Sequence, residues 1–283
     1  MRWQGREESS NIDDRRGFGG GKIVGGGIGA LIIGAIVYLL GGDPSAILNQ
    51  ANNSQPLSPT EQVHQDSAKH FVAVVLKETE NVWHKQFSEM GRDYREPTIS
   101  LYNGETHAEG CGFASSAMGP FYCPGDEHVY IDLSFYDELK NKFHAPGEFA
   151  MAYVVAHEVG HHVQKLLGIE EKVQRARQQM DEREANRLSV KLELQADFLA
   201  GVWAHYAQEM DDIIEPGDID NALRAASAVG DDKLQQQSQG RVMPDAFTHG
   251  TSAQRMYWFK KGYETGDINQ GDTFNDASLA IAR

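Results

Sequence analysis

Residues 156–162 read AHEVGHH, in which His157, Glu158 and His161 form an H-E-x-x-H motif and His162 follows. Residues four apart share one face of an α-helix, so the imidazoles of His157 and His161 can bind the same metal ion. Glu158 directly follows the first histidine, where its carboxylate can take a proton from a metal-bound water. This spacing predicts a zinc hydrolase, most often a metalloprotease. The alternative is an ordinary amphipathic helix that happens to carry these three residues.

The sequence around the motif predicts a helix that is buried in the protein. Apolar residues recur at helical spacing between Gly147 and Leu167. Pro146 stands just before this stretch and Gly168 just after it, where proline and glycine are common at helix ends. Histidines without partners on a buried face cost free energy, and a bound metal ion removes that cost. We therefore prefer the metal-binding interpretation.

A catalytic zinc site also needs a third protein ligand and one open position. Residues 190–201 predict a second buried helix, and they carry Glu193 and Asp197 four apart on one face. Carboxylates among leucine, alanine and phenylalanine side chains need a cation or hydrogen-bond donors. We predict that Glu193 is the third ligand and that Asp197 accepts a hydrogen bond from a ligand histidine's second nitrogen. Asp197 as the ligand is the less favoured alternative.

The pairing of HEVGHH with the later ELQAD segment at 193–197 resembles the glutamate-ligand zinc peptidases, or gluzincins. In particular, the chain resembles the bacterial family named putative neutral zinc metallopeptidases, and the resemblance covers nearly the whole chain. It implies that His157, His161 and Glu193 bind one zinc ion and that Glu158 is the general base. It implies no particular substrate.

A further candidate site lies in residues 248–255, which read THGTSAQR. Ser252 is expected to cap the helix that follows, with His249 in the preceding loop and Arg255 in the first turn. The stretch is similar to the H-P-x-x-x-x-x-R segment of membrane-associated gluzincins, with Gly250 in place of proline. That resemblance implies that the histidine or the arginine donates a hydrogen bond to the oxyanion of the tetrahedral intermediate. Alternatively, His249 only orders a loop. Arg255 is expected to need a partner, because the helix dipole disfavours a positive charge near the start of a helix.

Residues 23–40 are free of charge and long enough to span a bilayer as a slightly short helix. Five Lys and Arg residues precede this stretch, and none lies between 41 and 68. The asymmetry predicts a single-pass protein of the bacterial inner membrane, with a cytoplasmic tail at 1–22 and an extracytoplasmic, periplasmic remainder. A cleaved signal peptide is the alternative, but no small-x-small cleavage site follows the apolar stretch.

The chain has two cysteines, Cys111 and Cys123. Outside the cytoplasm they are expected to form a disulfide that closes a hairpin, and reduced buried thiols are the alternative. The net charge is −15, and it is −16 beyond Lys22, because residues 1–22 carry five basic and four acidic side chains. This acidic balance argues against nucleic-acid binding, so the expected partner is a peptide or protein substrate.

A linker at 41–59 leaves residues 60–283 for one metallopeptidase domain. We expect an α+β, mainly helical fold with a small antiparallel sheet before the motif helix. Zinc peptidases bind an extended peptide on the edge strand of such a sheet. The expected elements are a helix at 60–90, short strands at 97–102, 113–116, 121–122 and 129–133, a charged helix or lid at 170–189, and a polar loop at 231–240.

The combined prediction is a membrane-anchored zinc metallopeptidase. Gln164 and Leu167 exclude the metzincin class, which requires glycine and histidine at these positions. A zinc-stabilised membrane scaffold without activity is one alternative, although a structural site has no need of Glu158. A zinc amide hydrolase that acts on cell-wall material is the other. His162 lies about 100° round the helix from His161, so it is expected to be a core histidine rather than a ligand.

Overall fold

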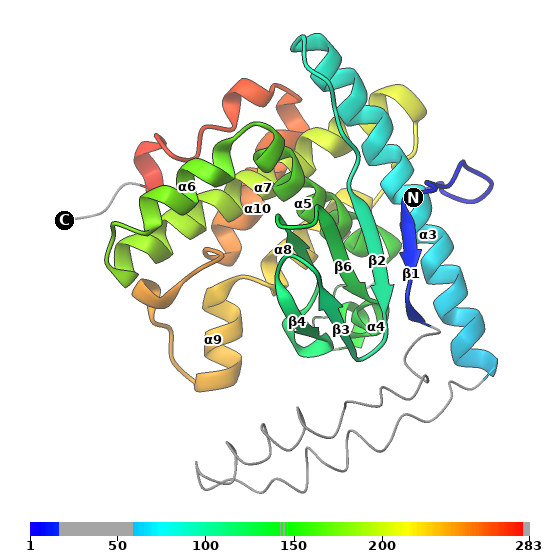
Figure 1. Ribbon diagram of the computed structural model, residues 1–283, viewed down its shortest axis with the longest axis horizontal. Coiled ribbons are helices and arrows are strands. Elements are labelled where there is room, and N and C mark those ends of the chain that lie inside the picture. The colour runs from blue at the N-terminus through cyan, green and yellow to red at the C-terminus, as the bar shows by residue number, and fades with distance from the viewer. Residues whose placement is uncertain (17–58, 142, 144, 146, 280–283) are drawn as a thin grey trace, which may run out of the picture.

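The computed structural model describes residues 1–16, 59–141, 143, 145 and 147–279 (Figure 1). The predicted membrane span at 23–40 lies outside these residues, as does nearly all of the predicted linker. None of the helices in the described ranges is long and apolar enough to cross a membrane.

Two long helices, α5 (Glu148–Leu166) and α7 (Glu182–Asp211), form the centre of the domain. Apolar residues surround α5, which is why it is buried along most of its length, as the sequence predicts. The helices approach closely at Gly160, where a Cβ atom would lie 3.0 Å from the carbonyl oxygen of Ala196. This crossing brings the AHEVGHH motif against the helix that carries Glu193.

A third helix, α10 (Ser252–Thr265), packs on α7 so closely that the two backbones touch. A Cβ atom at Gly201 would lie 2.0 Å from the carbonyl oxygen of Phe259, and one at Gly262 would lie 2.0 Å from that of Phe198. No side chain fits at either position. The contact fixes α10 relative to α7 and places the start of α10 beside the metal motif.

The remaining helices surround this core. They are α3 (Pro59–Glu89), α4 (Ser134–Asn141), α6 (Ile169–Arg177), α8 (Asp218–Ala228) and α9 (Asp231–Gln239), with 3-10 turns η2 (Ser116–Met118), η3 (Pro244–Ala246), η4 (Ile268–Gln270) and η5 (Ala277–Leu279).

The structure confirms the long helix predicted at 60–90, which corresponds to α3. The charged stretch at 170–189 is helical and divided between α6 and the start of α7. The loop predicted at 231–240 is wrong, because these residues form α9. Two aspartates in its first turn stabilise the helix by interacting with the positive end of the helix dipole, and glutamine is a good helix former. Gly240 then ends the helix with a φ of 68°.

A four-stranded sheet lies beside α5, with the strand order β1-β2-β6-β5 (Figure 1). β1, β2 and β6 run parallel, and only β5 is antiparallel to its neighbour. The predicted antiparallel sheet is therefore wrong for the main sheet, because the chain between β2 and β6 folds into a separate hairpin and β6 returns parallel to β2. The strands are β1 (Ile12–Asp14), β2 (Thr98–Tyr102), β5 (Phe121–Cys123) and β6 (His128–Asp132).

The separate hairpin consists of β3 (Glu105–Ala108) and β4 (Gly112–Ser115), which are antiparallel. The predicted disulfide between Cys111 and Cys123 is confirmed, and it joins Cα atoms 5.9 Å apart. It ties the turn of the hairpin to the end of β5. The disulfide thus braces the outermost strand of the main sheet.

Residues 1–16 pack against the domain, which differs from the predicted division into a tail at 1–22 and a domain at 60–283. β1 pairs with β2, and Met1 belongs to the hydrophobic core. The sequence gives no local sign of this packing, because the partners of this segment lie on helices and strands far along the chain.

Candidate metal centre

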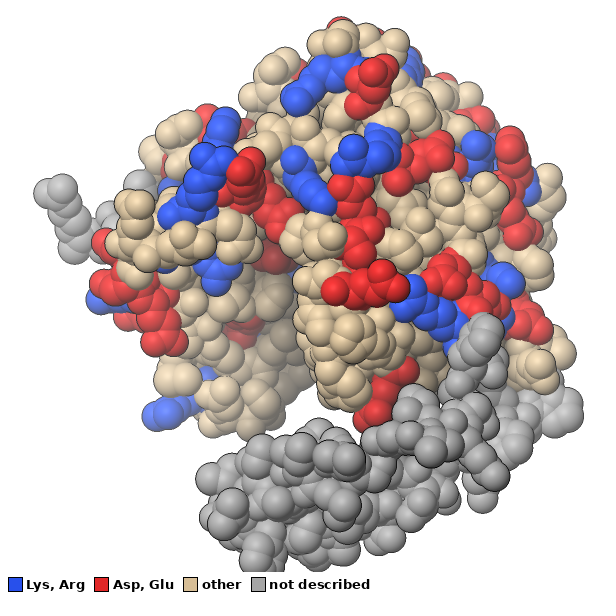
Figure 2. All heavy atoms as spheres, viewed as in Figure 1, with Lys and Arg blue, Asp and Glu red and all other residues tan. Residues whose placement is uncertain are grey.

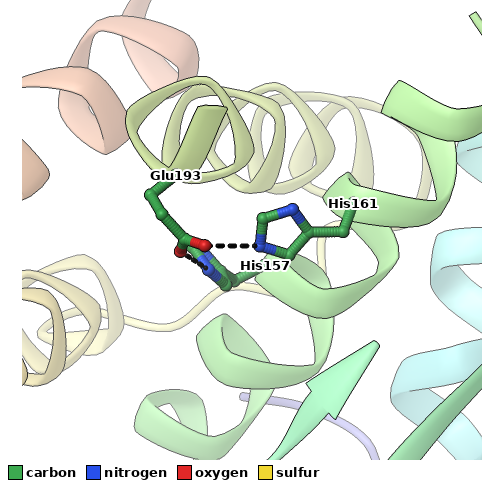
Figure 3. Close-up of side chains that lie close together, drawn as sticks. All are labelled: His157, His161 and Glu193. Carbon is green, nitrogen blue, oxygen red and sulfur yellow. Dashed lines mark hydrogen bonds and ion pairs between the residues drawn. The ribbon is translucent and has the colours of Figure 1, made fainter. Parts of the chain in front are cut away.

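Three side chains converge between α5 and α7, as Figure 3 shows. The Nε2 atom of His157 lies 3.1 Å from one carboxylate oxygen of Glu193, and the Nε2 atom of His161 lies 3.5 Å from the other. One potential ligand atom from each residue lies within 4.8 Å of the others, so the group could hold a metal ion. These are the three residues that the sequence analysis selected as ligands.

The outer nitrogens of both histidines have partners. His157 Nδ1 lies 2.9 Å from Asp197 Oδ1, and His161 Nδ1 lies 2.9 Å from Gln164 Oε1. Because carboxylate and amide oxygens accept hydrogen bonds, each Nδ1 can donate to its partner. Each Nε2 faces Glu193, donates to it while protonated, and can bind a metal ion once it loses that proton. Two imidazole nitrogens and one carboxylate are a usual ligand set for catalytic zinc, so these residues fit that ion.

Asp197 is fully buried and is held by three partners. Tyr153 donates its hydroxyl to Oδ1, and Arg255 donates Nε to Oδ2 at 2.8 Å and Nη2 to Oδ1 at 3.0 Å. Burial raises the pKa of Asp197, but the charges of Arg255 and His157 outweigh it and bring the pKa down to about 2. The aspartate is therefore an anion that orients His157.

Arg255 is 4% exposed, and its guanidinium donates hydrogen bonds to neighbouring groups of the protein. Besides the contacts to Asp197, its Nη2 donates to the Tyr153 hydroxyl at 3.1 Å and its Nη1 to the Val229 carbonyl at 3.3 Å. The position of Arg255 near a helix start predicts a partner for its charge, and the structure provides Asp197. These contacts hold Asp197 beside His157.

Nearby carboxylates favour the protonated form of the motif histidines. Burial lowers the pKa of His157, but the charge of Asp197 and the hydrogen bonds to Asp197 and Glu193 raise it to about 10. Burial raises the pKa of Glu193, yet the charge of His161 and the hydrogen bonds from both histidines hold it well below its usual value. The site thus attracts positive charge, and a divalent cation competes with protons for its ligands.

Glu158 is 8% exposed and lies beside the three converging side chains. Burial raises the pKa of its carboxyl group, although the nearby histidines oppose this effect. The backbone amide of Tyr122 on β5 opposes the burial effect weakly and lowers this pKa. Groups of the converging ligands and of β5 thus both act on the motif glutamate.

His249 lies in the loop before α10 and is held by Asp231 at the start of α9. One carboxylate oxygen of Asp231 accepts hydrogen bonds from the backbone N–H groups of Thr248, His249 and Gly250, at 2.8, 2.6 and 3.0 Å. The other lies 3.3 Å from His249 Nδ1. Burial lowers the pKa of His249, but the Asp231 hydrogen bond and the Glu193 charge raise it above its usual value.

The role of Asp231 is not predictable from the sequence, because the polar residues 231–240 predict a loop. The helix cap lies one residue before the predicted Ser252, since Thr251 caps α10 and forms a capping box with Gln254. Gln164 is a further partner that the sequence prediction does not include. Its spacing of three from His161 on one helix face is the signal in the sequence that indicates this contact.

His162 is a core histidine, in agreement with the sequence analysis. Its Nδ1 lies 2.9 Å from the Tyr122 hydroxyl and its Nε2 lies 2.6 Å from the Arg95 carbonyl oxygen. Burial lowers its pKa to about 4. With both nitrogens engaged away from Glu193, it supports β5 rather than binding metal.

A helical domain in which HExxH faces a glutamate on a second helix is the architecture of a zinc-peptidase-like protein. The chain belongs to the family described as "Putative neutral zinc metallopeptidase", whose sequence model matches residues 1–274. This agrees with the resemblance seen in the sequence motifs.

Relatives of similar length occur in distant bacteria. The chain is 52% identical over 286 residues to the uncharacterized protein YpfJ of Escherichia coli K12, covering 97% of this chain and 99% of that protein. It is 42% identical over 261 residues to the uncharacterized protein Rv2575 of Mycobacterium tuberculosis H37Rv, covering 85% and 86%. No solved structure matches the chain.

Proposed function

We propose that this protein is a zinc metallopeptidase in which His157, His161 and Glu193 hold one zinc ion. The convergence of the two Nε2 atoms and the Glu193 carboxylate, with Glu158 buried beside them, carries the proposal. When bound, zinc would supply Lewis acidity toward a substrate carbonyl and a water molecule.

Glu158 is the general base in this proposal. Its carboxylate takes a proton from the water that attacks the peptide carbonyl and passes it to the leaving amine. Burial raises the pKa of this carboxyl group, which makes it a better proton acceptor than an exposed glutamate.

His249 is the proposed oxyanion donor. Asp231 fixes the loop backbone and one ring nitrogen, so the other nitrogen can donate a hydrogen bond where charge develops. The influence of the Glu193 charge on the pKa of His249 supports its closeness to the metal ligands.

The position of β5 supports a peptide as the substrate. β5 is an edge strand of the main sheet, and the backbone amide of its Tyr122 is among the groups that act on the pKa of Glu158. An extended peptide that pairs with this free edge would run beside the proposed general base. The disulfide and His162 hold the strand in place.

Surface charge agrees with a peptide partner rather than a nucleic acid. On the face seen in Figure 2, basic and acidic side chains alternate over the described residues and no basic stripe gathers. Association of residues 23–40 with a membrane belongs to the proposal on the strength of the sequence alone, whereas the placement of residues 1–22 on the opposite side from the domain does not.

Metal removal tests the proposal. Purified protein should contain one zinc ion per chain, cleave members of a peptide library, lose this activity with a chelator and regain it with added zinc. His161→Ala should lose both zinc and activity, whereas His107→Ala, at an exposed position of β3, should keep both. Cleavage of cell-wall fragments but not peptides would replace the peptidase proposal with the amide-hydrolase alternative.

A further inference from the structure

Residues 1–16 are built into the fold through β1. Ile12, Asp13 and Asp14 pair in parallel with residues 99–101 of β2. Backbone hydrogen bonds run from Ile99 N to the Asn11 carbonyl oxygen at 2.9 Å and from Arg15 N to the Leu101 carbonyl oxygen at 2.8 Å. The sheet is therefore four-stranded only when this segment lies on the domain.

Two buried glutamates on α3 take partners from the same segment. Glu78 is 3% exposed, and Arg6 donates Nη1 to its carboxylate at 2.9 Å. Glu80 is 2% exposed and accepts hydrogen bonds from Ser9 Oγ at 2.5 Å and Asn11 Nδ2 at 2.9 Å. Buried carboxylates are costly unless they are paired, so these positions on α3 are suited to this segment and not to solvent.

The segment also reaches the helices of the metal centre. Arg6 donates Nη2 to the carbonyl oxygen of Asp211, the last residue of α7. Trp3 Nε1 donates a hydrogen bond to the carboxylate of Glu148, the first residue of α5, at 2.7 Å. The Trp3 ring also packs edge-on against the Phe71 ring, with 5.4 Å between the ring centroids. Contacts to α3, α5, α7 and β2 together make the segment an integral part of the domain.

The end of the segment lies beside the beginning of α3, as Figure 1 shows. Arg16 donates Nη2 to Asp66 at 3.0 Å, and Lys69 donates Nζ to Asp14 at 3.0 Å. The chain therefore leaves the described structure at residue 16 and re-enters it at residue 59 on the same part of the surface.

We propose that residues 1–16 and the domain from residue 59 onward lie on the same side of the membrane and fold as one unit. A single crossing by residues 23–40 would place them on opposite sides and would break every contact described above. Glu78 would then lose Arg6, and Glu80 would lose Ser9 and Asn11. This inference is independent of the proposed peptidase activity, and it replaces the topology expected from the charge asymmetry.

Thiol labelling of the full-length protein in its membrane tests the sidedness. The native cysteines are joined in a disulfide, so a single cysteine can be introduced at Glu7, whose side chain is 78% exposed, or at Val242, which is 42% exposed. Each variant is treated with a membrane-impermeant maleimide before and after permeabilisation, and labelling in denaturant defines complete reaction. We expect both positions to react in the same step. Reaction of one before and the other only after permeabilisation would overturn the proposal.

Cross-linking tests the contact itself. Glu7 Oε1 lies 3.8 Å from Lys77 Nζ on α3, so a short bismaleimide should join the pair in E7C/K77C within one chain. Mass spectrometry of the digested monomer reports the linked peptides, and the two single variants are the controls for links between chains. If both cysteines react but the monomer contains no linked peptide, the segment does not lie on its own domain and the proposal fails.

Discussion

Asp197 Oδ1 lies 2.9 Å from His157 Nδ1, so a carboxylate of α7 orients a proposed metal ligand of α5. The same carboxylate is held by Arg255 from α10, which reaches it across the direct backbone contact between α7 and α10. Three helices thus fix one imidazole ring. The orientation of the metal site depends on buried packing as well as on the ligands.

Replacing Asp197 with asparagine should weaken zinc binding. The substitution removes the negative charge that fixes the tautomer of His157, and loss of such a partner costs about 10–100-fold in metal affinity. Competition with a chromophoric chelator measures the change. Asp220→Asn, at an exposed position of α8, is the control and should bind zinc like the unmodified protein. Equal affinities of the two variants would contradict the orienting role.

Replacing Arg255 with methionine should destabilise the fold. It leaves the Asp197 charge buried without its main partner, and breaking a buried ion pair costs about 3–5 kcal/mol. Urea unfolding of the zinc-free protein measures the free energy without a contribution from metal binding. A loss comparable to that of Arg175→Met, on the exposed face of α6, would show that the Arg255 pair is not important for stability.

Activity should depend on pH through His249 if its imidazolium donates to the oxyanion. Burial lowers its pKa, but Asp231 and Glu193 raise it above the ordinary value, so the protonated form persists to higher pH. Asp231→Asn removes one of these effects and should shift the alkaline loss of kcat/KM to lower pH. The profile of kcat/KM against pH for both proteins measures this. An unchanged alkaline limb would remove His249 from the proposed mechanism.

Removal of the disulfide should loosen β5. The bridge closes a loop between positions 12 residues apart, and such a cross-link is worth about 2–4 kcal/mol. The double variant C111A/C123A should unfold at lower temperature and raise KM for peptides more than it lowers kcat, because the edge strand is less well held. A lower melting temperature with unchanged KM would separate the strand from substrate binding.

The sequence predicted most of the metal site because its signals are local. The four-residue spacings of His157 and His161 and of Glu193 and Asp197 each lie on one helix, and apolar neighbours show that both helices are buried. The roles of Asp231 and of the first sixteen residues were not predictable in this way. They depend on contacts between segments far apart in the chain, and polar glutamines in 231–240 suggested a loop although the residue type permits a helix.

Glu158→Gln, with zinc content and peptide hydrolysis measured on the same sample, shows whether this carboxylate drives zinc-dependent peptide cleavage. The amide has the shape of the carboxylate but cannot accept the proton, so we predict one zinc ion per chain and a loss of kcat/KM of about 10²–10⁴-fold. Glu209→Gln, at an exposed position of α7, should retain full activity. If Glu158→Gln binds zinc and cleaves peptides at the rate of the unmodified protein, Glu158 is not the general base and the proposed mechanism is wrong.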